Sequence, residues 1–262
     1  MHEDVATSRA QVSRRRALGL GGSVGLTALL TACGISGQGG ATPTAVPTTS
    51  GSAATVTPSV SPNADIKALL DSVGSCALTP EETEGPYYFD VNSIRQDLRE
   101  DRPGTPLRLA LRVQSFPGCE PIKNAVVEIW HCDAGGVYSG FEVASKGGAG
   151  GSKTDDGTYL RGAQVTNADG IVEFLTIYPG WYRGRTVHIH FKVHLDNQAV
   201  LTSQLFFEES VTSEVYSASP YDEHTGRETT NENDNIFDSS LVVSSRTTAE
   251  GQLGLLNIGV NA

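Results

Sequence analysis

The stretch GAQVTNADGIVEFLTIYPGWYRGRTVHIHF, from Gly162 to Phe191, decides the fold expected for this chain. Two runs of strand-forming residues, 162–166 and 171–177, flank Asn167-Ala168-Asp169-Gly170, which is a strong hairpin-turn signal. A Pro-Gly turn then leads into a third strand pattern, 186–194, which carries His188-Ile189-His190. These elements predict antiparallel β-structure with polar side chains gathered on one strand.

Strand patterns continue on both sides of this stretch. The other expected strands are Leu107–Val113, Ala125–Trp130, Ala199–Phe207 and one or two within Ser240–Ile258. One short helix is expected at Asp65–Val73, where the apolar residues have helical spacing, and long loops at Ala144–Ser152 and Glu208–Asp238. Short strands at this spacing favour an all-β, antiparallel sandwich or barrel.

The charge of the chain limits its partners. The 262 residues carry a formal net charge of −11. An acidic protein without a long basic run lacks the lysines and arginines that nucleic-acid phosphates require, so we expect no nucleic-acid partner. The length suits one sizeable domain.

The N-terminus has the features of an export signal. Arg14, Arg15 and Arg16 precede an uncharged stretch, 17–32, that is too short to span a bilayer and is typical of a twin-arginine signal. Leu30-Thr31-Ala32-Cys33 is similar to a bacterial lipobox, in which the cysteine is acylated. We expect residues 1–33 to direct export to an extracellular or cell-surface location, with membrane contact only through a lipidated Cys33. The alternative is an ordinary secretory signal in which Cys33 has no special role.

Composition divides the rest of the chain in two. Residues 34–63 are mainly Gly, Ser, Thr, Pro and Ala with almost no charge, so they are expected to form a disordered tether before a domain at 64–262. The chain has four cysteines, Cys33, Cys76, Cys119 and Cys132. If Cys33 is lipidated, the other three allow one disulfide and one free thiol, and the sequence does not choose the pair.

Two histidines and two tyrosines are candidates for a metal site. His188 and His190 point to the same face of their strand, but Lys192 and His194 share that face. A pair of solvated histidines is therefore the alternative. The Pro-Gly turn delivers Tyr182 shortly before His188, and the glycines at 135–136 permit an unusual turn that presents Tyr138.

At this point the sequence resembles the intradiol ring-cleaving dioxygenases, and among them the secreted branch. The segments that carry the resemblance are Thr83–Tyr88, Asn124–Tyr138, Arg161-Gly162 with Gln164 and Thr166, and Thr176–Phe191. The resemblance implies a β-sandwich and one Fe(III) per chain. Carried over residue by residue, the iron ligands fall on Tyr138, Tyr182, His188 and His190.

The resemblance also assigns roles around the metal. Tyr182 is implied to leave the iron when substrate binds and to act as an internal base. Arg185 is implied to stabilise charge that develops on the ring, and Gln204 to orient the substrate or its oxygen adduct. Tyr87 falls in a segment that borders the substrate pocket in relatives, while His131 and Asp133 are expected to be structural partners of the Tyr138 turn.

The donor set agrees with a trivalent metal. Zinc is expected to recruit Cys, His or carboxylate, whereas phenolate needs a strong Lewis acid because a free tyrosine has a pKa of about 10. Two phenolates and one hydroxide neutralise Fe(III), so the site can be buried without a large charge penalty.

The implied function is oxidative. We expect a non-haem Fe(III) enzyme that inserts both atoms of O2 into a small catechol-type diol, cleaving between the hydroxylated carbons to give a muconate-type diacid. One alternative is a non-catalytic surface lipoprotein that binds aromatics or polysaccharide on the same sandwich. A hydrolase or cupin-like enzyme with another metal is a further alternative, although no additional carboxylate or third histidine lies at a recognisable spacing.

Overall fold

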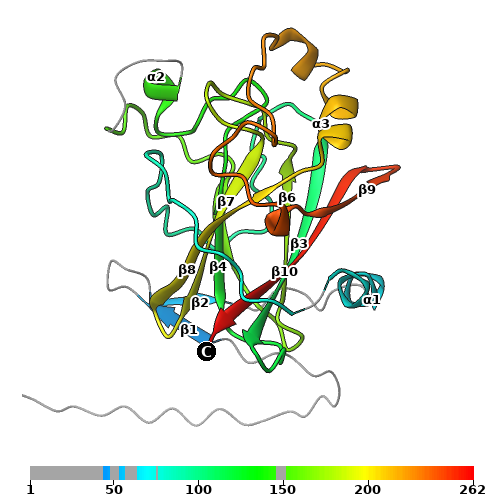
Figure 1. Cartoon of the computed structure of the whole chain (residues 1–262). Helices are drawn as coiled ribbons and strands as arrows, with labels where there is room; N and C mark the ends of the chain where they lie inside the picture. Colours follow the sequence, from blue (N-terminus) through cyan, green and yellow to red (C-terminus); the bar gives the residue numbers. More distant parts are fainter. Residues whose placement is uncertain (1–43, 48–52, 57–63, 75, 146–151) are drawn as a thin grey trace, which may run out of the picture. The chain divides into compact units, whose positions relative to one another are not determined.

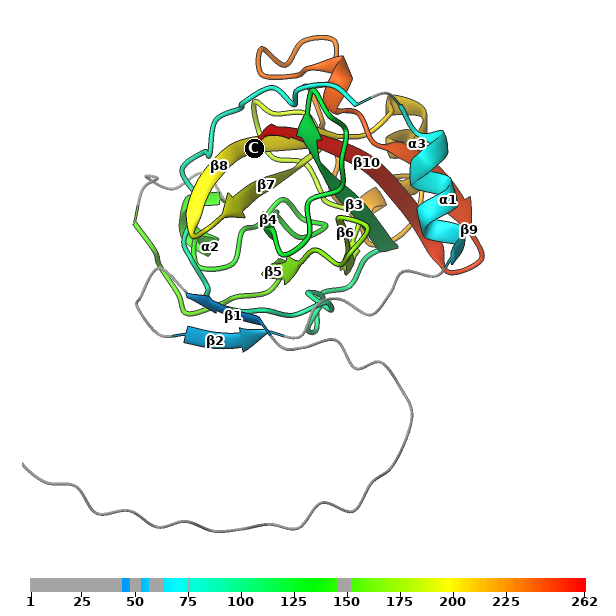
Figure 2. The same cartoon turned by 90° about the horizontal axis from the view of Figure 1, so that it is seen from below.

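The structure is a computed structural model that describes residues 44–47, 53–56, 64–74, 76–145 and 152–262 (Figure 1). Its main part contains two four-stranded sheets, with the strand orders β6-β3-β10-β9 and β5-β4-β7-β8. Side chains from both sheets, such as Leu109 and Ile189, share one buried hydrophobic cluster. The predicted all-β sandwich is therefore confirmed, and Figure 2 shows the two sheets as separate layers.

The strands lie close to the stretches that the sequence patterns predicted. The first sheet holds β3 (Pro106–Phe116), β6 (Ile171–Ile177), β9 (Ser244–Thr248) and β10 (Gly251–Asn261). The second holds β4 (Val126–Trp130), β5 (Arg161–Val165), β7 (His188–Leu195) and β8 (Gln198–Phe206). The agreement has a simple cause, because every second side chain of a strand on a sandwich must face the core.

The strand pairing differs from the prediction in two places. The turn at Asn167–Gly170 forms as expected, with Asn167 Oδ1 accepting hydrogen bonds from the amides of Asp169 and Ile171. However, β5 and β6 belong to opposite sheets, so this turn carries the chain across the sandwich and does not close a hairpin. In addition, β10 pairs with β3 in parallel. These two strands are far apart in the chain, so no short connection forces them to be antiparallel.

Helices are short and lie outside the sheets. The predicted first helix is present as α1 (Ala64–Ser72), which packs Ile66 and Leu70 against the outer face of the first sheet. The stretch expected to be a loop at 208–238 instead contains α3 (Glu209–Val215) and the 3-10 turn η1 (Tyr221–Glu223). The remaining helical segments are α2 (Glu142–Ser145) and η2 (Ser239–Leu241). Within the described residues, none of these helices has the length and apolar character of a membrane span.

Part of the expected tether has local structure. Strands β1 (Thr44–Pro47) and β2 (Ala53–Val56) pair with each other in antiparallel fashion. The prediction of disorder throughout 34–63 did not anticipate this pair, which is favoured by the valines and threonines of both segments. The export signal at 1–33, including Cys33, and most of the tether lie outside the described residues.

The structure selects one of the possible cysteine pairings. Cys76 and Cys119 form a disulfide, with their Cα atoms 5.5 Å apart, and Cys132 is a free, buried cysteine. The bond ties the segment after α1 to the loop after β3. The sequence expectation of one disulfide and one free thiol among these three residues is therefore met.

Candidate metal centre

The four side chains expected to hold a metal come together at one end of the second sheet. Tyr138 lies in the turn after β4, Tyr182 in the connection between β6 and β7, and both histidines on β7. The Tyr182 hydroxyl lies 3.2 Å from Nε2 of His188, which in turn lies 3.1 Å from Nε2 of His190. The rings of Tyr138 and Tyr182 meet edge to face, with centroids 5.6 Å apart.

The spacing of these atoms suits a shared cation. Donor atoms on one metal with bonds of about 2.1 Å lie about 3.0 to 3.4 Å apart at octahedral or tetrahedral angles. The Nδ1 atom of His188 donates a hydrogen bond to the carbonyl oxygen of Thr186 at 2.7 Å. With its proton on Nδ1, His188 directs the Nε2 lone pair toward His190 and Tyr182.

Two buried polar atoms of the four expected ligands lack hydrogen-bond partners among the described residues. They are the hydroxyl of Tyr138 and Nδ1 of His190. Tyr138 is fully buried, so its unpaired hydroxyl has an energetic cost unless something binds it. A cation held between Tyr138, Tyr182 and the histidines would satisfy the phenol oxygen, and the residues therefore fit a metal ion.

Burial gives all four side chains an unusual proton affinity. It raises the pKa of Tyr138 and of Tyr182 above the ordinary value of 10.0. Burial, followed by the charge of Arg185, lowers the pKa of His188 from 6.5 to about 3, and burial also lowers the pKa of His190. The site therefore favours neutral imidazoles, which are the ligating form, while its phenols need a nearby cation before they ionise.

Cysteines and carboxylates do not complete a site around the histidines. Within the described residues, no group of three or more His, Cys, Asp or Glu side chains could hold a metal ion. The two phenols are the additional donors that the geometry provides.

Close backbone approach brings the two tyrosine turns together. Gly136 has a φ of +80°, and a Cβ at this position would lie 2.2 Å from the carbonyl oxygen of Trp181. On the other side of the contact, a Cβ at Gly180 would lie 2.4 Å from the carbonyl oxygen of Ala134. Only glycines allow the turn that carries Tyr138 to lie against the turn that carries Tyr182.

Arg185 and Gln204 lie against the cluster and contact each other. Arg185 donates from Nη2 to Oε1 of Gln204 at 2.5 Å, and its Nη1 atom lies 3.5 Å from Nε2 of His188. Gln204 is fully buried and donates from Nε2 to the carbonyl oxygen of Thr83 at 2.8 Å. Its amide thus connects Arg185 to the 83–88 segment, which gives Gln204 a bridging position that the sequence did not predict.

The 83–88 segment passes close to His190 and to the two candidate tyrosines. A Cβ at Gly85 would lie 3.2 Å from Cε1 of His190. The ring of Tyr87 lies 4.8 Å from that of Tyr138 and 6.2 Å from that of Tyr182, measured between centroids. Tyr87 is therefore placed beside both expected tyrosine ligands.

The structure separates the other members of the histidine face from the cluster. Lys192 forms an ion pair with Glu84, and its Nζ lies 3.4 Å from the ring centroid of Tyr88. His194 has Nε2 3.6 Å from a carboxylate oxygen of Glu128. Lys192 and His194 therefore have acidic partners of their own, whereas His188 and His190 contact each other and Tyr182.

His131 and Asp133 act as structural partners of the Tyr138 turn, as expected. The ring of His131 forms hydrogen bonds with the carbonyl oxygen of Cys132 at 2.8 Å and with the Thr176 hydroxyl at 2.7 Å. Asp133 Oδ1 accepts from the amides of Gly135 and Val137 at 3.0 and 2.9 Å. Sequence reasoning missed a different carboxylate, the buried Asp234, which lies against Arg185.

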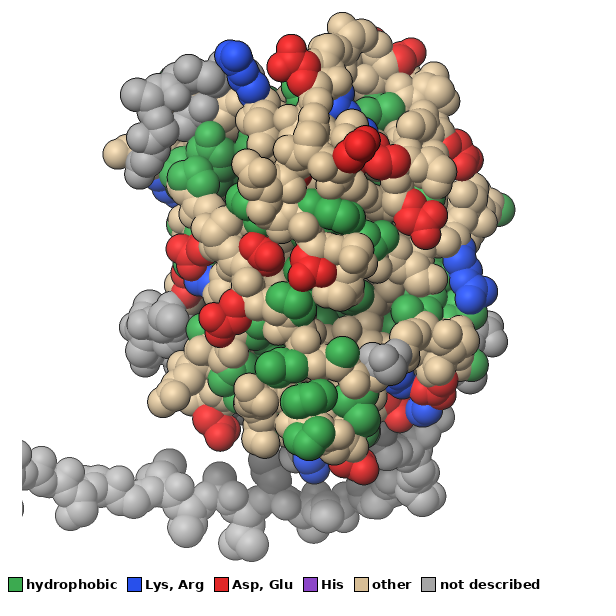
Figure 3. Space-filling view, in the orientation of Figure 1, with side chains coloured by type: hydrophobic (Ala, Val, Ile, Leu, Met, Phe, Trp, Pro, Cys, Tyr) green, Lys and Arg blue, Asp and Glu red, His purple; other side chains and the backbone are tan. Residues whose placement is uncertain are grey.

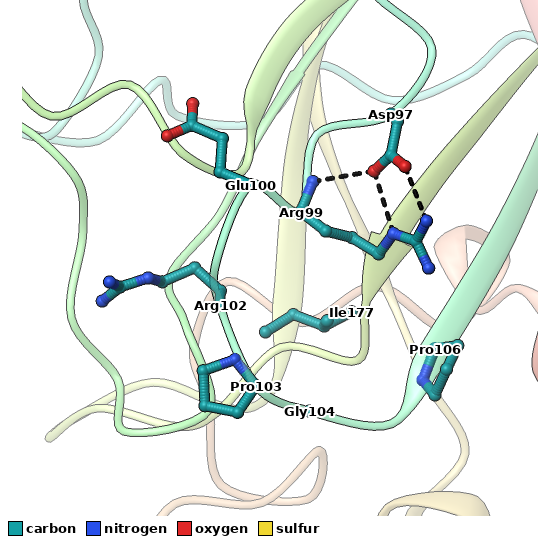
Figure 4. Close-up of a pocket in the computed structure, with 8 residues that line it drawn as sticks. All are labelled: Asp97, Arg99, Glu100, Arg102, Pro103, Gly104, Pro106 and Ile177. Carbon is teal, nitrogen blue, oxygen red and sulfur yellow. Dashed lines mark hydrogen bonds and ion pairs between the residues drawn. The ribbon is translucent and has the colours of Figure 1, made fainter.

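A separate hollow lies at the start of β3 and has a volume of about 420 Å³ (Figure 4). Its polar lining includes Arg99, whose Nε and Nη2 donate to the two carboxylate oxygens of Asp97. These charges compensate each other, and none of the four expected ligands lines this hollow. The face drawn in Figure 3 carries acidic side chains spread among apolar ones, in agreement with the negative net charge.

Comparisons with known proteins identify the same part of the chain. A family model described as dioxygenase matches residues 83–235. Catechol 1,2-dioxygenase 1 of Acinetobacter lwoffii is 31% identical over 153 residues, which is 50% of this chain and 46% of that protein. The chain spans about half the length of the curated relatives it matches.

Solved structures extend the likeness to the whole sandwich. An intradiol ring-cleavage dioxygenase from Tetranychus urticae is 36% identical, with a TM-score of 0.67 over 71% of this chain and 95% of that one. The dioxygenase domain of a dioxygenase and carbohydrate-binding fusion from Streptomyces sp. SirexAA-E is 30% identical, with a TM-score of 0.54 over 71% and 99% of the two chains. From the family model and these structural relatives, we conclude that the chain belongs to the intradiol ring-cleaving dioxygenase family.

Proposed function

We propose that this protein is a non-haem Fe(III) dioxygenase that cleaves small catechol-type diols between their hydroxylated carbons. The observation that supports it most is that the Tyr182 hydroxyl and Nε2 of His190 lie 3.2 and 3.1 Å from Nε2 of His188, next to the hydroxyl of Tyr138. Curated relatives are catechol and chlorocatechol 1,2-dioxygenases, which supports a diol substrate for this chain.

Tyr138, Tyr182, His188 and His190 would hold the iron. When bound, ferric iron would accept the oxygens of the diol and draw electron density from the ring, which makes a ring carbon reactive toward O2. Two neutral imidazoles and two phenolates give the site a charge that offsets most of a trivalent cation. The ring of Trp130 stacks on His190 with an interplanar angle of 5°, which holds that imidazole in one orientation.

The two tyrosines differ in a way that suits different roles. Tyr138 is fully buried, and its hydroxyl makes no hydrogen bond of good geometry among the described residues, although it interacts with the hydroxyl of Tyr182; a protonated Tyr138 would therefore be poorly satisfied. Tyr182 is only partly buried and lies in the connection before β7. This difference agrees with the role that the family resemblance implies, in which the phenolate oxygen of Tyr182 would accept one proton from the incoming diol while Tyr138 remains ionised.

Arg185 supplies positive charge where the ring is attacked. Its Nη1 atom lies 3.5 Å from Nε2 of His188, so the guanidinium lies at the edge of the metal cluster. In a buried site a fixed cation stabilises negative charge that develops on the substrate ring, at no cost of reorganisation. Gln204 contributes by holding Nη2 of Arg185, as a positioning residue.

Colour and oxygen uptake test this proposal together. Iron-loaded protein should be red-purple from tyrosinate-to-iron charge transfer, and it should consume O2 with at least one of catechol, 4-methylcatechol, hydroxyquinol and protocatechuate. Tyr182→Phe should shift or bleach the colour and reduce turnover. A colourless protein with stoichiometric zinc, or a coloured protein inactive on all four diols, would sink the proposal, and the second result would favour a non-catalytic binder of aromatics or polysaccharide.

We also infer export and lipid attachment at Cys33 from the N-terminal sequence. The disulfide between Cys76 and Cys119 supports an oxidising compartment, since disulfides are rare in the cytosol. Cell fractionation should recover the protein with the membrane, and Cys33→Ala should release it in soluble form. Recovery of the unaltered protein in the cytosol would contradict the inference.

A further inference from the structure

The segment between α3 and η2 supplies a buried carboxylate to the edge of the metal cluster. The side chain of Asp234 is 1% exposed. Its Oδ2 atom accepts hydrogen bonds from Nε of Arg185 at 3.0 Å and from the Thr186 amide at 2.7 Å. Its Oδ1 atom accepts from the Ile236 amide at 2.8 Å. Three donors therefore surround this carboxylate, so its buried negative charge is compensated.

The charge state of Asp234 agrees with this arrangement. Burial alone would raise its pKa, but hydrogen bonds from the amides of Ile236 and Thr186, together with the charge of Arg185, lower the pKa below 3.8. The carboxylate is consequently an anion at neutral pH, and it can act as a fixed partner for the guanidinium.

The contacts of Arg185 leave only one end of its guanidinium directed at the cluster. Nε is held by Asp234 and Nη2 by Gln204, while Nη1 lies 3.5 Å from Nε2 of His188. A guanidinium is planar, so two fixed nitrogen atoms determine the position of the third. Asp234 and Gln204 together thus decide where the positive charge of Arg185 lies.

Thr186 connects the same carboxylate to a histidine of the cluster. Its amide donates to Asp234, and its carbonyl oxygen accepts from Nδ1 of His188 at 2.7 Å. Its hydroxyl donates to Oδ1 of Asn231 at 2.7 Å and accepts from Arg227 at 3.1 Å, and Arg227 in turn forms two hydrogen bonds with Glu209. The backbone between Arg185 and His188 is therefore fixed on several sides by the 208–238 segment.

We propose that Asp234 is a positioning residue that sets the orientation of Arg185 directly and that of His188 through the Thr186 peptide. The arrangement places a carboxylate, a peptide group and an imidazole in series, which is equivalent to the carboxylate–histidine pairs that orient metal ligands in other proteins. Its catalytic consequence rests on the proposed function, because Arg185 matters for turnover only if the ring of a diol is attacked beside it.

The test compares Asp234→Asn with Glu232→Gln in iron-loaded protein. Asparagine keeps the shape of the side chain, but it removes the charge and replaces one acceptor with an NH2 group. Asp234→Asn should lower kcat about 10- to 100-fold, the usual effect of losing a partner of this kind, and should shift the charge-transfer absorption. KM should change less than about threefold, because the lost interaction serves the transition state. Glu232 is exposed on the same segment, so Glu232→Gln removes the same charge and should change none of these quantities.

A double variant shows whether Asp234 acts through Arg185. If it does, the loss of kcat in the protein with both Arg185→Ala and Asp234→Asn should be clearly smaller than the product of the two single losses, because residues that act as a unit are not additive. The effect of Asp234→Asn that remains in the Arg185→Ala protein measures the second route, through Thr186 to His188. Full additivity of the two losses in kcat would overturn the proposal. So would an Asp234→Asn protein whose kcat and absorption both equal those of the unaltered protein.

A measurement on the unaltered, iron-free protein tests the contacts without any variant. In 15N NMR spectra, the Nε–H proton of Arg185 should exchange slowly with water, and His188 should carry its proton on Nδ1. Rapid exchange of this Arg185 proton would overturn the proposal even if Asp234→Asn fails to fold. Failure of the proposed function is recognised separately, because the unaltered iron-loaded protein would then turn over no diol while the NMR signals keep their expected form.

Discussion

Replacing the Cys76–Cys119 disulfide with two serines should destabilise the domain without altering the metal centre. The two cysteines are separated by 43 positions in the sequence. Closing a loop of this length in the unfolded chain removes conformational entropy worth about 4 kcal/mol at 25 °C. Cys119 is exposed and Cys76 is half-buried, so serine leaves no deep cavity at either position and adds no large second penalty.

Urea-induced unfolding of the two proteins measures this difference. The free energy of unfolding should fall by about 4 kcal/mol, and the melting temperature by roughly 10 °C for a domain of this size. Reducing the unaltered protein should reproduce the same loss, which serves as the control for the serine substitutions. A loss below about 1 kcal/mol would refute the loop-closure reasoning, and a disulfide-linked peptide that contains Cys132 would refute the pairing.

Three further predictions concern buried groups around the centre. Gly136→Ala should push apart the two tyrosine turns, since its Cβ would lie 2.2 Å from the Trp181 carbonyl oxygen. The charge-transfer absorbance of the iron-loaded protein and its kcat should both fall at least about tenfold. Gly226→Ala, at a φ of +91° with nothing within 4 Å, should cost only about 1 kcal/mol and leave the colour unchanged. Burial lowers the pKa of His131 to about 4. The unfolded chain, with a histidine pKa of about 6.5, then binds the proton first, so stability falls as pH drops from about 6.5 to 4. His131→Gln should reduce the pH-dependent loss between pH 7 and pH 5 by about 2 kcal/mol, as measured by urea unfolding at both pH values; an unchanged loss would contradict the assignment. Arg161 is buried and donates from Nε and Nη2 to Ser139. Replacing Arg161 with lysine should lower the free energy of unfolding of the protein by about 3 kcal/mol, because lysine keeps the charge but cannot make both hydrogen bonds. Equal denaturant midpoints for the two proteins would argue against this role.

The sequence predicted the elements of the fold better than their pairing. The run of strand-forming residues beside the Asn167–Gly170 turn located the strand Ile171–Ile177 correctly, and the alternation of Leu107, Leu109, Leu111 and Val113 located β3. The turn at Asn167–Gly170 was also correct, since its hydrogen bonds are local. Pairing depends on contacts far along the chain, so the separation of β5 from β6 into different sheets and the parallel alignment of β10 with β3 could not be inferred from local patterns.

In the candidate site, too, local sequence predicted which residues share a face but not which of them come together. The strand period alone put His188, His190, Lys192 and His194 on one face, and only contacts with other segments distinguish them. Lys192 forms an ion pair with Glu84 from a distant segment, and no local sequence pattern predicts this pair. The turns before Tyr138 and Tyr182 made them candidates and the resemblance to a family made them ligands, whereas the reason that they can meet is the close backbone contact at Gly136 and Gly180.

The role proposed for Asp234 could not be predicted from the sequence. It lies in a polar stretch without strand or helix periodicity, and its partner Arg185 is 49 positions away. An aspartate in a polar segment is usually solvated, so its type alone predicts a surface residue. What distinguishes it is burial with three donors around it, and this depends on α3 and the turns after it folding back over the start of β7. A segment that the sequence describes as a loop therefore supplies the carboxylate that holds Arg185 beside the proposed metal ligands, and within this segment the buried Asp234, not its exposed neighbours, should affect kcat.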